Sequence, residues 1–236
     1  MKKLKKLGAL SVDTAIIAIA AALYLCLMSP AAVMTAAGSR RSPVIRCASE
    51  NEVSLLFSVS WDAAALGGIL DVLKDEGVKA TFAVSGEWAE DNSGMLKRMR
   101  EEGHEIATLG YDPFSDGGAA FLKDDLERSL NAISRAAGEV PVIYCCGTRS
   151  ADASARAGAK AGLTTVIPTV DLDCGGSAAG EILKKVGSAA SGGSIIGLQP
   201  TRSLEEALPF LIEKIKNMGF DIVPTHKMLY NHTDKV

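Results

Sequence analysis

Few side chains in this 236-residue chain could hold a metal ion or move a proton. Its three histidines are His104, at the start of an expected strand, His226, near the end of the chain, and His232, in the last few residues. A mononuclear hydrolytic metal site takes about three protein ligands from His, Asp or Glu and keeps one position open. Only His226 is expected near a face where such ligands could meet. The sequence therefore predicts no resident metal cofactor at a histidine-based site.

Carboxylates, a serine and cysteines in the sequence could support two other kinds of site, a carboxylate cation site or a nucleophilic hydrolase site. Acidic residues that follow expected strands are Asp62, Glu87, Asp112, Asp171 and Asp173. A carboxylate site could bind hydrated magnesium or calcium. Ser58 could act as a nucleophile with His226 and an aspartate, and Cys146 or Cys174 could do so with His226. In the plainer interpretation, Ser58 bonds to nearby backbone and the cysteines are small packing residues.

Cysteine spacing excludes a zinc ribbon. The chain has five cysteines, Cys26, Cys47, Cys145, Cys146 and Cys174, and no C-x-x-C pair. Adjacent Cys145 and Cys146 cannot easily bond to each other. We expect the cysteines outside the N-terminal segment to be small, semi-buried residues.

The N-terminal segment is predicted to be a membrane anchor rather than part of the fold. Lysines at positions 2, 3, 5 and 6 precede the uncharged run Ala15–Met34, which is about long enough to span a hydrocarbon core of roughly 30 Å. Basic residues before the span predict a cytoplasmic N-terminus and an extracytoplasmic C-terminal domain. A cleaved signal peptide is the alternative. We expect residues 1–34 to form the tip and anchor, 35–51 a linker, 52–230 the domain and 231–236 a tail.

Between residues 52 and 230, strand-like and helix-like segments alternate. The expected strands cover 52–59, 79–85, 104–109, 140–145, 163–168, 194–198 and 220–224. The expected helices cover 64–77, 93–103, 119–138, 151–162, 179–190 and 203–219. Strict alternation predicts an α/β domain with a parallel sheet of about seven strands, and the short, evenly spaced strands favour a closed or partly closed (β/α) barrel. The net charge of −3 and the absence of a basic stripe argue against nucleic acid as a partner.

In such a barrel the chemistry lies at the C-terminal ends of the strands, which we call the rim. The expected rim residues are 58–62, 86–88, 109–113, 145–149, 171–174, 199–202 and 225–226. Trp61 and Trp88 could offer flat faces to a sugar ring, with Tyr111 and Tyr144 beside them, or the tryptophans could simply cap the barrel mouth. Arg149 could meet an anionic wall polymer, or it could be a solvated loop residue.

Two segments, "KATFAVSGEWAE" at 79–90 and "GHEI" at 103–106, carry a resemblance to a known family. Residues 52–228 resemble the polysaccharide deacetylases, also called NodB-like, and especially a membrane-anchored branch from sporulating bacteria. The resemblance implies a deformed (β/α) barrel. It also implies hydrolytic removal of acetyl groups from N-acetylglucosamine or N-acetylmuramic acid in peptidoglycan, chitin or a similar glycan, using a divalent metal that is often zinc.

The positions that this resemblance assigns to metal ligands hold other residues here. The family's aspartate ligand falls at Val59, and its two histidine ligands fall at Leu109 and Pro113. None of these three side chains can coordinate a metal ion in any protonation state.

The acid–base positions are changed as well. The family's aspartate base falls at Ser58, the arginine that orients it at Ile143, and its catalytic histidine at Gln199. Asp173 is retained, but Cys174 stands where the family has tryptophan. His226 is the remaining candidate for proton transfer.

These substitutions predict a pseudoenzyme. We expect a membrane-anchored, extracytoplasmic homologue that binds glycan or a partner protein during cell-wall or spore formation, with peptidoglycan as the expected glycan. One alternative is an active carbohydrate N-deacetylase with a rearranged site, which would need zinc or another divalent metal. Another is a structural partner in an envelope protein complex with no affinity for sugar.

Overall fold

The computed structural model describes residues 42–61, 64–115, 117–172, 174 and 179–230. The expected anchor, the first part of the expected linker, Asp173 and the expected tail lie outside these residues. Within the described residues, no helix has both the length and the apolar character needed to span a bilayer.

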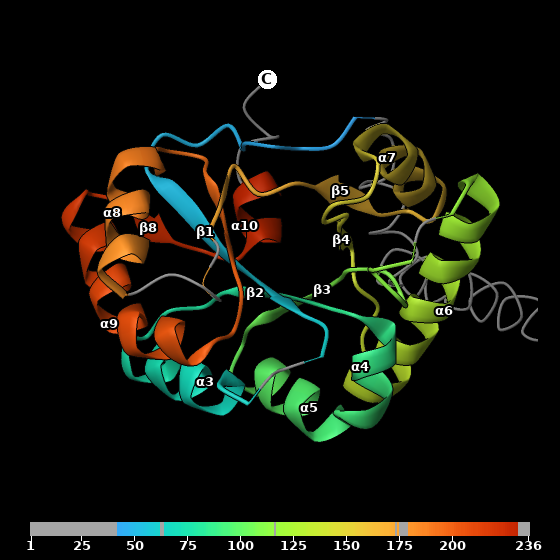
Figure 1. Ribbon diagram of the computed structural model, residues 1–236, viewed down its shortest axis with the longest axis horizontal. Coiled ribbons are helices and arrows are strands. Elements are labelled where there is room, and N and C mark those ends of the chain that lie inside the picture. The colour runs from blue at the N-terminus through green and yellow to red at the C-terminus, as the bar shows by residue number, and fades with distance from the viewer. Residues whose placement is uncertain (1–41, 62–63, 116, 173, 175–178, 231–236) are drawn as a thin grey trace, which may run out of the picture. The chain divides into compact units, whose positions relative to one another are not determined.

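The domain is built on one eight-stranded sheet in which all the strand pairings are parallel (Figure 1). Its strands are β1 (Glu52–Val59), β2 (Thr81–Val84), β3 (Glu105–Thr108), β4 (Ile143–Cys145), β5 (Thr164–Val166), β6 (Val170–Asp171), β7 (Ile195–Leu198) and β8 (Asp221–Ile222). The order is β5-β4-β3-β2-β1-β7-β6, and β8 pairs with β1 off this path. The parallel α/β sheet is confirmed, and this half-barrel fits the expected deformed barrel. The two-residue strand β6 was not predicted.

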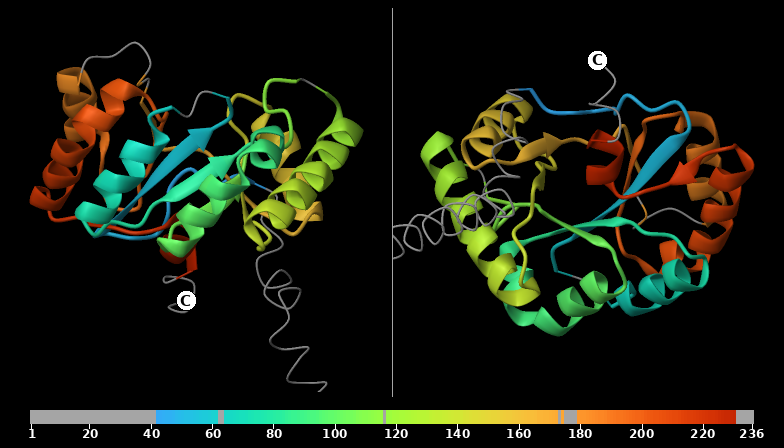
Figure 2. Two further views of the ribbon diagram at one scale, coloured as in Figure 1. Left: turned by 90° about the horizontal axis from the view of Figure 1, so that it is seen from below. Right: turned by 180° about the vertical axis from the view of Figure 1, so that it is seen from behind.

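Helices surround the sheet. They are α3 (Leu66–Asp75), α4 (Gly86–Asp91), α5 (Ser93–Glu101), α6 (Ala119–Ala137), α7 (Ala151–Lys160), α8 (Ala179–Ala189), α9 (Arg202–Asn217) and α10 (Thr225–Tyr230). In the front and back views (Figures 1 and 2), α3 to α9 lie along the periphery, whereas the short α10 lies inside this ring. The sequence analysis predicted neither α4 nor α10, because each has only six residues.

Alternation along β1 separates two apolar layers. Val53, Leu55, Phe57 and Val59 belong to a large outer core between the sheet and the helices. Leu56 belongs to a second cluster, the interior cluster, which includes Ala83, Ala107, Ile143 and Ile195 from the other strands. Met228 and Leu229 of α10 also belong to it, so α10 packs against the inner face of the sheet.

The expected linker over 35–51 is wrong for its described part. Val44 and Cys47 are buried in the interior cluster. The Val44 N–H donates to the Thr165 carbonyl at 2.8 Å, and the Cys47 N–H donates to the Gly193 carbonyl at 2.8 Å. This segment therefore joins β5 to the start of β7 and belongs to the domain.

Candidate functional site

Strand register brings several of the family positions to one edge of the sheet. Ser58 pairs with Ala83, and Gln199 directly follows Leu198, the partner of Phe57. Leu109 directly follows β3, and its N–H donates to the Val84 carbonyl at 2.9 Å. Ser58, Leu109 and Gln199 therefore share the C-terminal edge, as the alternation of strands and helices predicted.

The side chains at the metal-ligand positions do not fit a bound cation. Val59 is fully buried in the outer core, and Leu109 is buried in the interior cluster. Pro113 lies half-buried in the loop after β3. Among the residues that the structure describes, no group of three or more His, Cys, Asp or Glu side chains could hold a metal ion.

The acid–base positions also lack the expected chemistry. Gln199 is exposed and Ser58 is half-buried, while Ile143 is fully buried in the interior cluster. A glutamine amide does not transfer protons near neutral pH, and a serine hydroxyl needs a neighbouring base. The retained Asp173 lies outside the described residues.

His226 does not lie on the rim, so its expected position is wrong. Strand β8 pairs with Glu52 and Val53, the first residues of β1, and the chain therefore enters α10 at the opposite end of the sheet. The His226 backbone N–H donates to Oε2 of Glu105, the first residue of β3, at 3.1 Å. Burial lowers the pKa of the imidazole, and its buried Nδ1 has no hydrogen-bond partner within the described part of the chain.

His104 is a structural residue, as expected. Its Nδ1 accepts a hydrogen bond from the Ala80 N–H at 3.2 Å, and its ring lies edge-on to Phe82. Burial lowers the imidazole pKa to about 4, so His104 is neutral at physiological pH.

The described cysteines, Cys47, Cys145, Cys146 and Cys174, are buried. Burial raises the pKa of Cys145 to about 12 and also raises the pKa of Cys146. Because the thiolate is the reactive form, neither thiol is activated as a nucleophile. The packing interpretation fits both residues, although they are more deeply buried than expected.

Three of the expected binding aromatics are instead packed into the domain. Trp88 lies in the outer core, and Tyr144 is fully buried against α6 and α7 residues. Tyr111 is buried as well, with its hydroxyl donating to Glu90 at 3.0 Å and the Arg128 guanidinium carbon 3.4 Å from its ring centroid. None of these three rings is exposed enough to serve as the binding surface that the sequence predicted.

Trp61 is the expected binding residue that remains accessible. It follows β1 on the rim and is 78% exposed. Its ring stacks on Phe114, which is 64% exposed, with the ring centroids 4.9 Å apart and the planes at 24°. Phe114 was not predicted from the sequence. The available signal was an aromatic residue directly after the family's second histidine position.

Arg149 is neither solvated nor free to meet an anionic polymer. Its Nη1 donates to Oδ2 of buried Asp125 on α6 at 2.8 Å and to the Tyr144 hydroxyl at 3.3 Å, and its Nη2 donates to the Asp112 carbonyl. The other carboxylate oxygen of Asp125 accepts the Asp112 N–H at 2.9 Å. The pair therefore holds both backbone polar groups of Asp112.

The side chains of Asp125 and Arg149 lie so close to the backbone of Gly110 that only glycine fits at this position. Gly110 has a φ of +94°, and a Cβ at this position would lie 2.2 Å from Oδ2 of Asp125 and 2.6 Å from Nη1 of Arg149. Only glycine combines this backbone conformation with the space available.

The fold is a parallel α/β half-barrel with Ser58, Leu109 and Gln199 at one edge of its sheet. Residues 46–166, just over half of the chain, match the family described as polysaccharide deacetylase, and the chain belongs to this family.

Sequence relatives are distant and longer. The uncharacterized protein YlxY of Bacillus subtilis is 28% identical over 172 residues, covering 71% of this chain and 54% of the relative. Peptidoglycan-N-acetylglucosamine deacetylase PgdA of Listeria monocytogenes is 25% identical over 184 residues, covering 76% of this chain and 39% of PgdA. The matches thus span about half or less of these relatives.

Solved structures show the same fold. BA3943 of Bacillus anthracis, described as a CE4 family pseudoenzyme, superposes with a TM-score of 0.75 at 24% identity, covering 81% of this chain and 70% of BA3943. Bacillus subtilis PdaA, described as a family 4 carbohydrate esterase, superposes with a TM-score of 0.74 at 20% identity, covering 81% of this chain and 86% of PdaA.

Proposed function

We propose that this chain is a cell-envelope member of the polysaccharide deacetylase family that binds a wall glycan such as peptidoglycan without deacetylating it. The observation that carries the proposal is the set of apolar side chains at the ligand positions, with Val59 and Leu109 buried and Pro113 half-buried. Substitution at a single position could be compensated by a neighbour, but the replacements lie at the end of β1 and in the loop after β3. The described residues offer no other group of three His, Cys, Asp or Glu side chains that could hold a metal ion.

Relatives support the glycan as partner and make loss of activity plausible. PgdA and PdaA are named as deacetylases of peptidoglycan N-acetylglucosamine and N-acetylmuramic acid. BA3943 is described as a pseudoenzyme of the same family, so members can keep the fold without the activity. For the present chain, amide hydrolysis would need an activated water and a proton donor, which Ser58 and Gln199 do not supply.

The proposal extends to location. The apolar run at 15–34 with lysines before it supports a single-pass membrane protein whose domain faces the cell wall. Roles in the vegetative wall, in spore formation or within an envelope protein complex all remain compatible with this placement. Fractionation of cells that express the full chain or a version lacking residues 1–41 tests it, because only the full chain should sediment with membranes.

Metal content and acetate release test the loss of activity. The full chain, purified in detergent and incubated with zinc, should retain no stoichiometric metal after desalting, as measured by elemental analysis. It should release no acetate from peptidoglycan under conditions in which Bacillus subtilis PdaA, the positive control, does. One zinc per chain together with acetate release would establish the active deacetylase with a rearranged site instead.

A further inference from the structure

Hydrogen bonds hold Gly110 and Asp112 in the loop between β3 and α6, although Leu109 and Pro113 in this loop cannot bind a metal ion. In the family resemblance this is the loop of the two histidines. Here Leu109 turns into the interior cluster, and Asp125 and Arg149 fix the N–H and carbonyl of Asp112. A buried ion pair costs desolvation energy, and removing one of its partners is strongly destabilising. The pair of Asp125 and Arg149 therefore fixes the position of the loop backbone at Asp112.

Phe114 is the side chain that the loop presents. The Phe114 N–H donates to Oδ1 of Asp112 at 3.2 Å, and the Ser115 hydroxyl donates to the other oxygen of that carboxylate. These bonds orient Phe114 so that its ring meets Trp61 from the end of β1. The buried pair of Asp125 and Arg149 fixes Asp112, and Asp112 in turn positions Phe114 against Trp61 at the surface.

From this geometry we propose that Trp61, supported by Phe114, is a platform for the apolar face of a pyranose ring in a wall glycan. Phe114 covers one face of the indole and holds its orientation, while the 78% exposure of Trp61 leaves the opposite side open. A pyranose presents axial C–H groups on one face, and these suit the electron-rich face of an aromatic ring. The proposal rests on the proposed function and specifies where on the rim the glycan binds.

A glycan fits this platform better than a lipid surface does. The carboxylate of Asp112 lies within hydrogen-bond reach of the Phe114 backbone, directly beside the pair. An ionised group at this position would have to be dehydrated on entering a bilayer, whereas it can accept hydrogen bonds from sugar hydroxyls. The pair also stands at the same strand ends as Ser58 and Gln199, where the family's chemistry is placed.

Binding of the full chain in detergent to peptidoglycan sacculi, and to a soluble N-acetylglucosamine tetrasaccharide, tests the platform. Trp61→Ala should weaken both interactions roughly tenfold, the loss expected for one well-stacked ring, and Phe114→Ala should weaken them less. Trp61→Phe should recover part of the affinity. The chain has two tryptophans and Trp88 is buried, so a change in emission on adding tetrasaccharide should come from Trp61 and disappear in Trp61→Phe.

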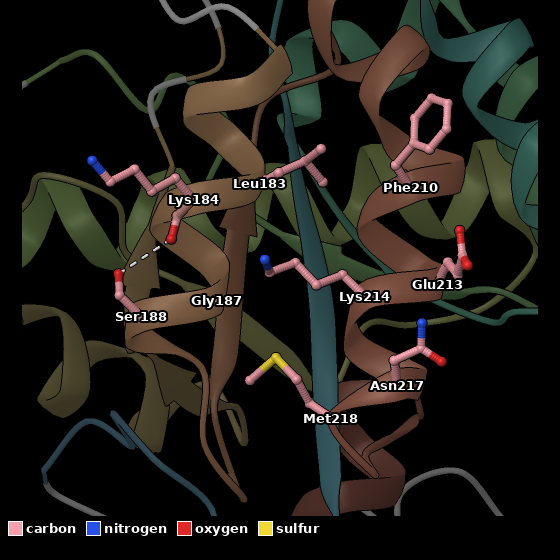
Figure 3. A pocket seen from close by; sticks show the side chains of 9 residues that line it. All are labelled: Leu183, Lys184, Gly187, Ser188, Phe210, Glu213, Lys214, Asn217 and Met218. Carbon is pink, nitrogen blue, oxygen red and sulfur yellow. Dashed lines mark hydrogen bonds between the residues drawn. The ribbon is translucent and has the colours of Figure 1, made fainter.

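Phe210→Ala provides the matched control. Phe210 is 60% exposed on α9 and lines a separate groove between α8 and α9 with Leu183 and Met218 (Figure 3). This variant should bind as the parent does. Unchanged binding in Trp61→Ala, an equal loss in Phe210→Ala, or Trp61-dependent binding to phospholipid vesicles but not to glycan would overturn the platform.

Acetate measured in the same incubations separates this proposal from the previous one. Acetate release with Trp61-dependent binding contradicts the inactive assignment and keeps the platform. No acetate and no dependence on Trp61 contradicts the platform and leaves the inactive assignment intact.

Discussion

The carboxyl group of Glu105 is buried, so its ionisation lowers the stability of the folded state. It begins β3, accepts hydrogen bonds from the Thr81 hydroxyl at 2.6 Å and from the His226 N–H at 3.1 Å, and lies beneath α10. Burial raises its pKa to about 7 from a usual value of 4.5. The two hydrogen bonds favour the ionised form but do not offset the burial.

The folded state therefore keeps a proton on Glu105 that the unfolded chain releases. The stability linked to this group is fully present below about pH 4.5 and is lost as the pH rises through 7. Glu105→Gln should make the free energy of unfolding less sensitive to pH between 5 and 8, so that the variant gains on the order of 1–2 kcal/mol relative to the parent at pH 8. Urea unfolding at several pH values measures this difference.

Glu101→Gln is the control for the Glu105 prediction. Glu101 is exposed on α5, four residues before Glu105, and loses the same charge. Its pH profile should follow that of the parent. A Glu105→Gln profile that also follows the parent would show that the carboxyl group is already ionised in the folded state near pH 5.

At the scale of elements, the long segments were predictable because their patterns repeat. The helix over 64–77 places Leu66, Ile69, Leu70 and Leu73 on one face, and all four are buried in α3. Short elements carry no such repeat, which is why α4, α10 and β6 were missed. The position of α10 depends on the pairing of β8 with the first residues of β1, a tertiary contact that no local pattern reveals.

The sequence predicted which residues lie at the rim, but it predicted only in part which of their side chains are exposed. Ser58, Leu109 and Gln199 could be assigned because strand ends meet at one edge of a parallel sheet. Whether Trp61 or Trp88 is free depends on packing, because both follow strands and both are aromatic. Asp125 lies in the run "KDDLERS", which has the composition of an exposed helix face, and only the fold places it against Arg149.

The ion pair between α6 and the segment after β4 should be strongly coupled. Arg149→Met leaves the Asp125 carboxylate buried without its partner, which costs about 3–5 kcal/mol of folding stability. Adding Asp125→Asn removes the stranded charge and should restore part of that loss. A double-mutant cycle from urea unfolding should give a coupling energy well above 1 kcal/mol.

Lys123 and Glu127 provide the comparison on the same helix. Their side chains are exposed and 3.5 Å apart, so the same cycle should give about 0.3–0.5 kcal/mol. Equal coupling in the two pairs would mean that Arg149 and Asp125 do not hold the loop.

At the scale of the whole molecule, two apolar layers stabilise the fold, and the rim supplies part of both. The outer core lies between sheet and helices, while α10 and residues 44–47 fill the interior cluster. The rim contributes to both layers, because Val59 and Trp88 belong to the outer core and Leu109 belongs to the interior cluster. Apolar residues at family positions on the rim therefore add to the packing of the fold. The same fold is found in PdaA and BA3943, which superpose with similar TM-scores.

If the rim alone has changed, ligands restored at the family positions should bind zinc. Ser58→Asp, Leu109→His and Pro113→His together should give one zinc per chain by elemental analysis, where the parent gives none. Ser58 pairs with Ala83 of the interior cluster and therefore lies on the same face of the sheet as Leu109. A second set places the aspartate at Val59, and it should bind zinc only if the end of β1 turns that side chain toward Leu109, because Val59 lies in the outer core. Since Val59 is fully buried, an aspartate there will also lower stability. The same sets with asparagine and glutamine instead of aspartate and histidine serve as controls that match the size of the side chains. A set that folds, judged by circular dichroism, yet binds no zinc would show that these positions do not share one pocket, and the assignment of Leu109 and Pro113 to the lost histidines would then be wrong.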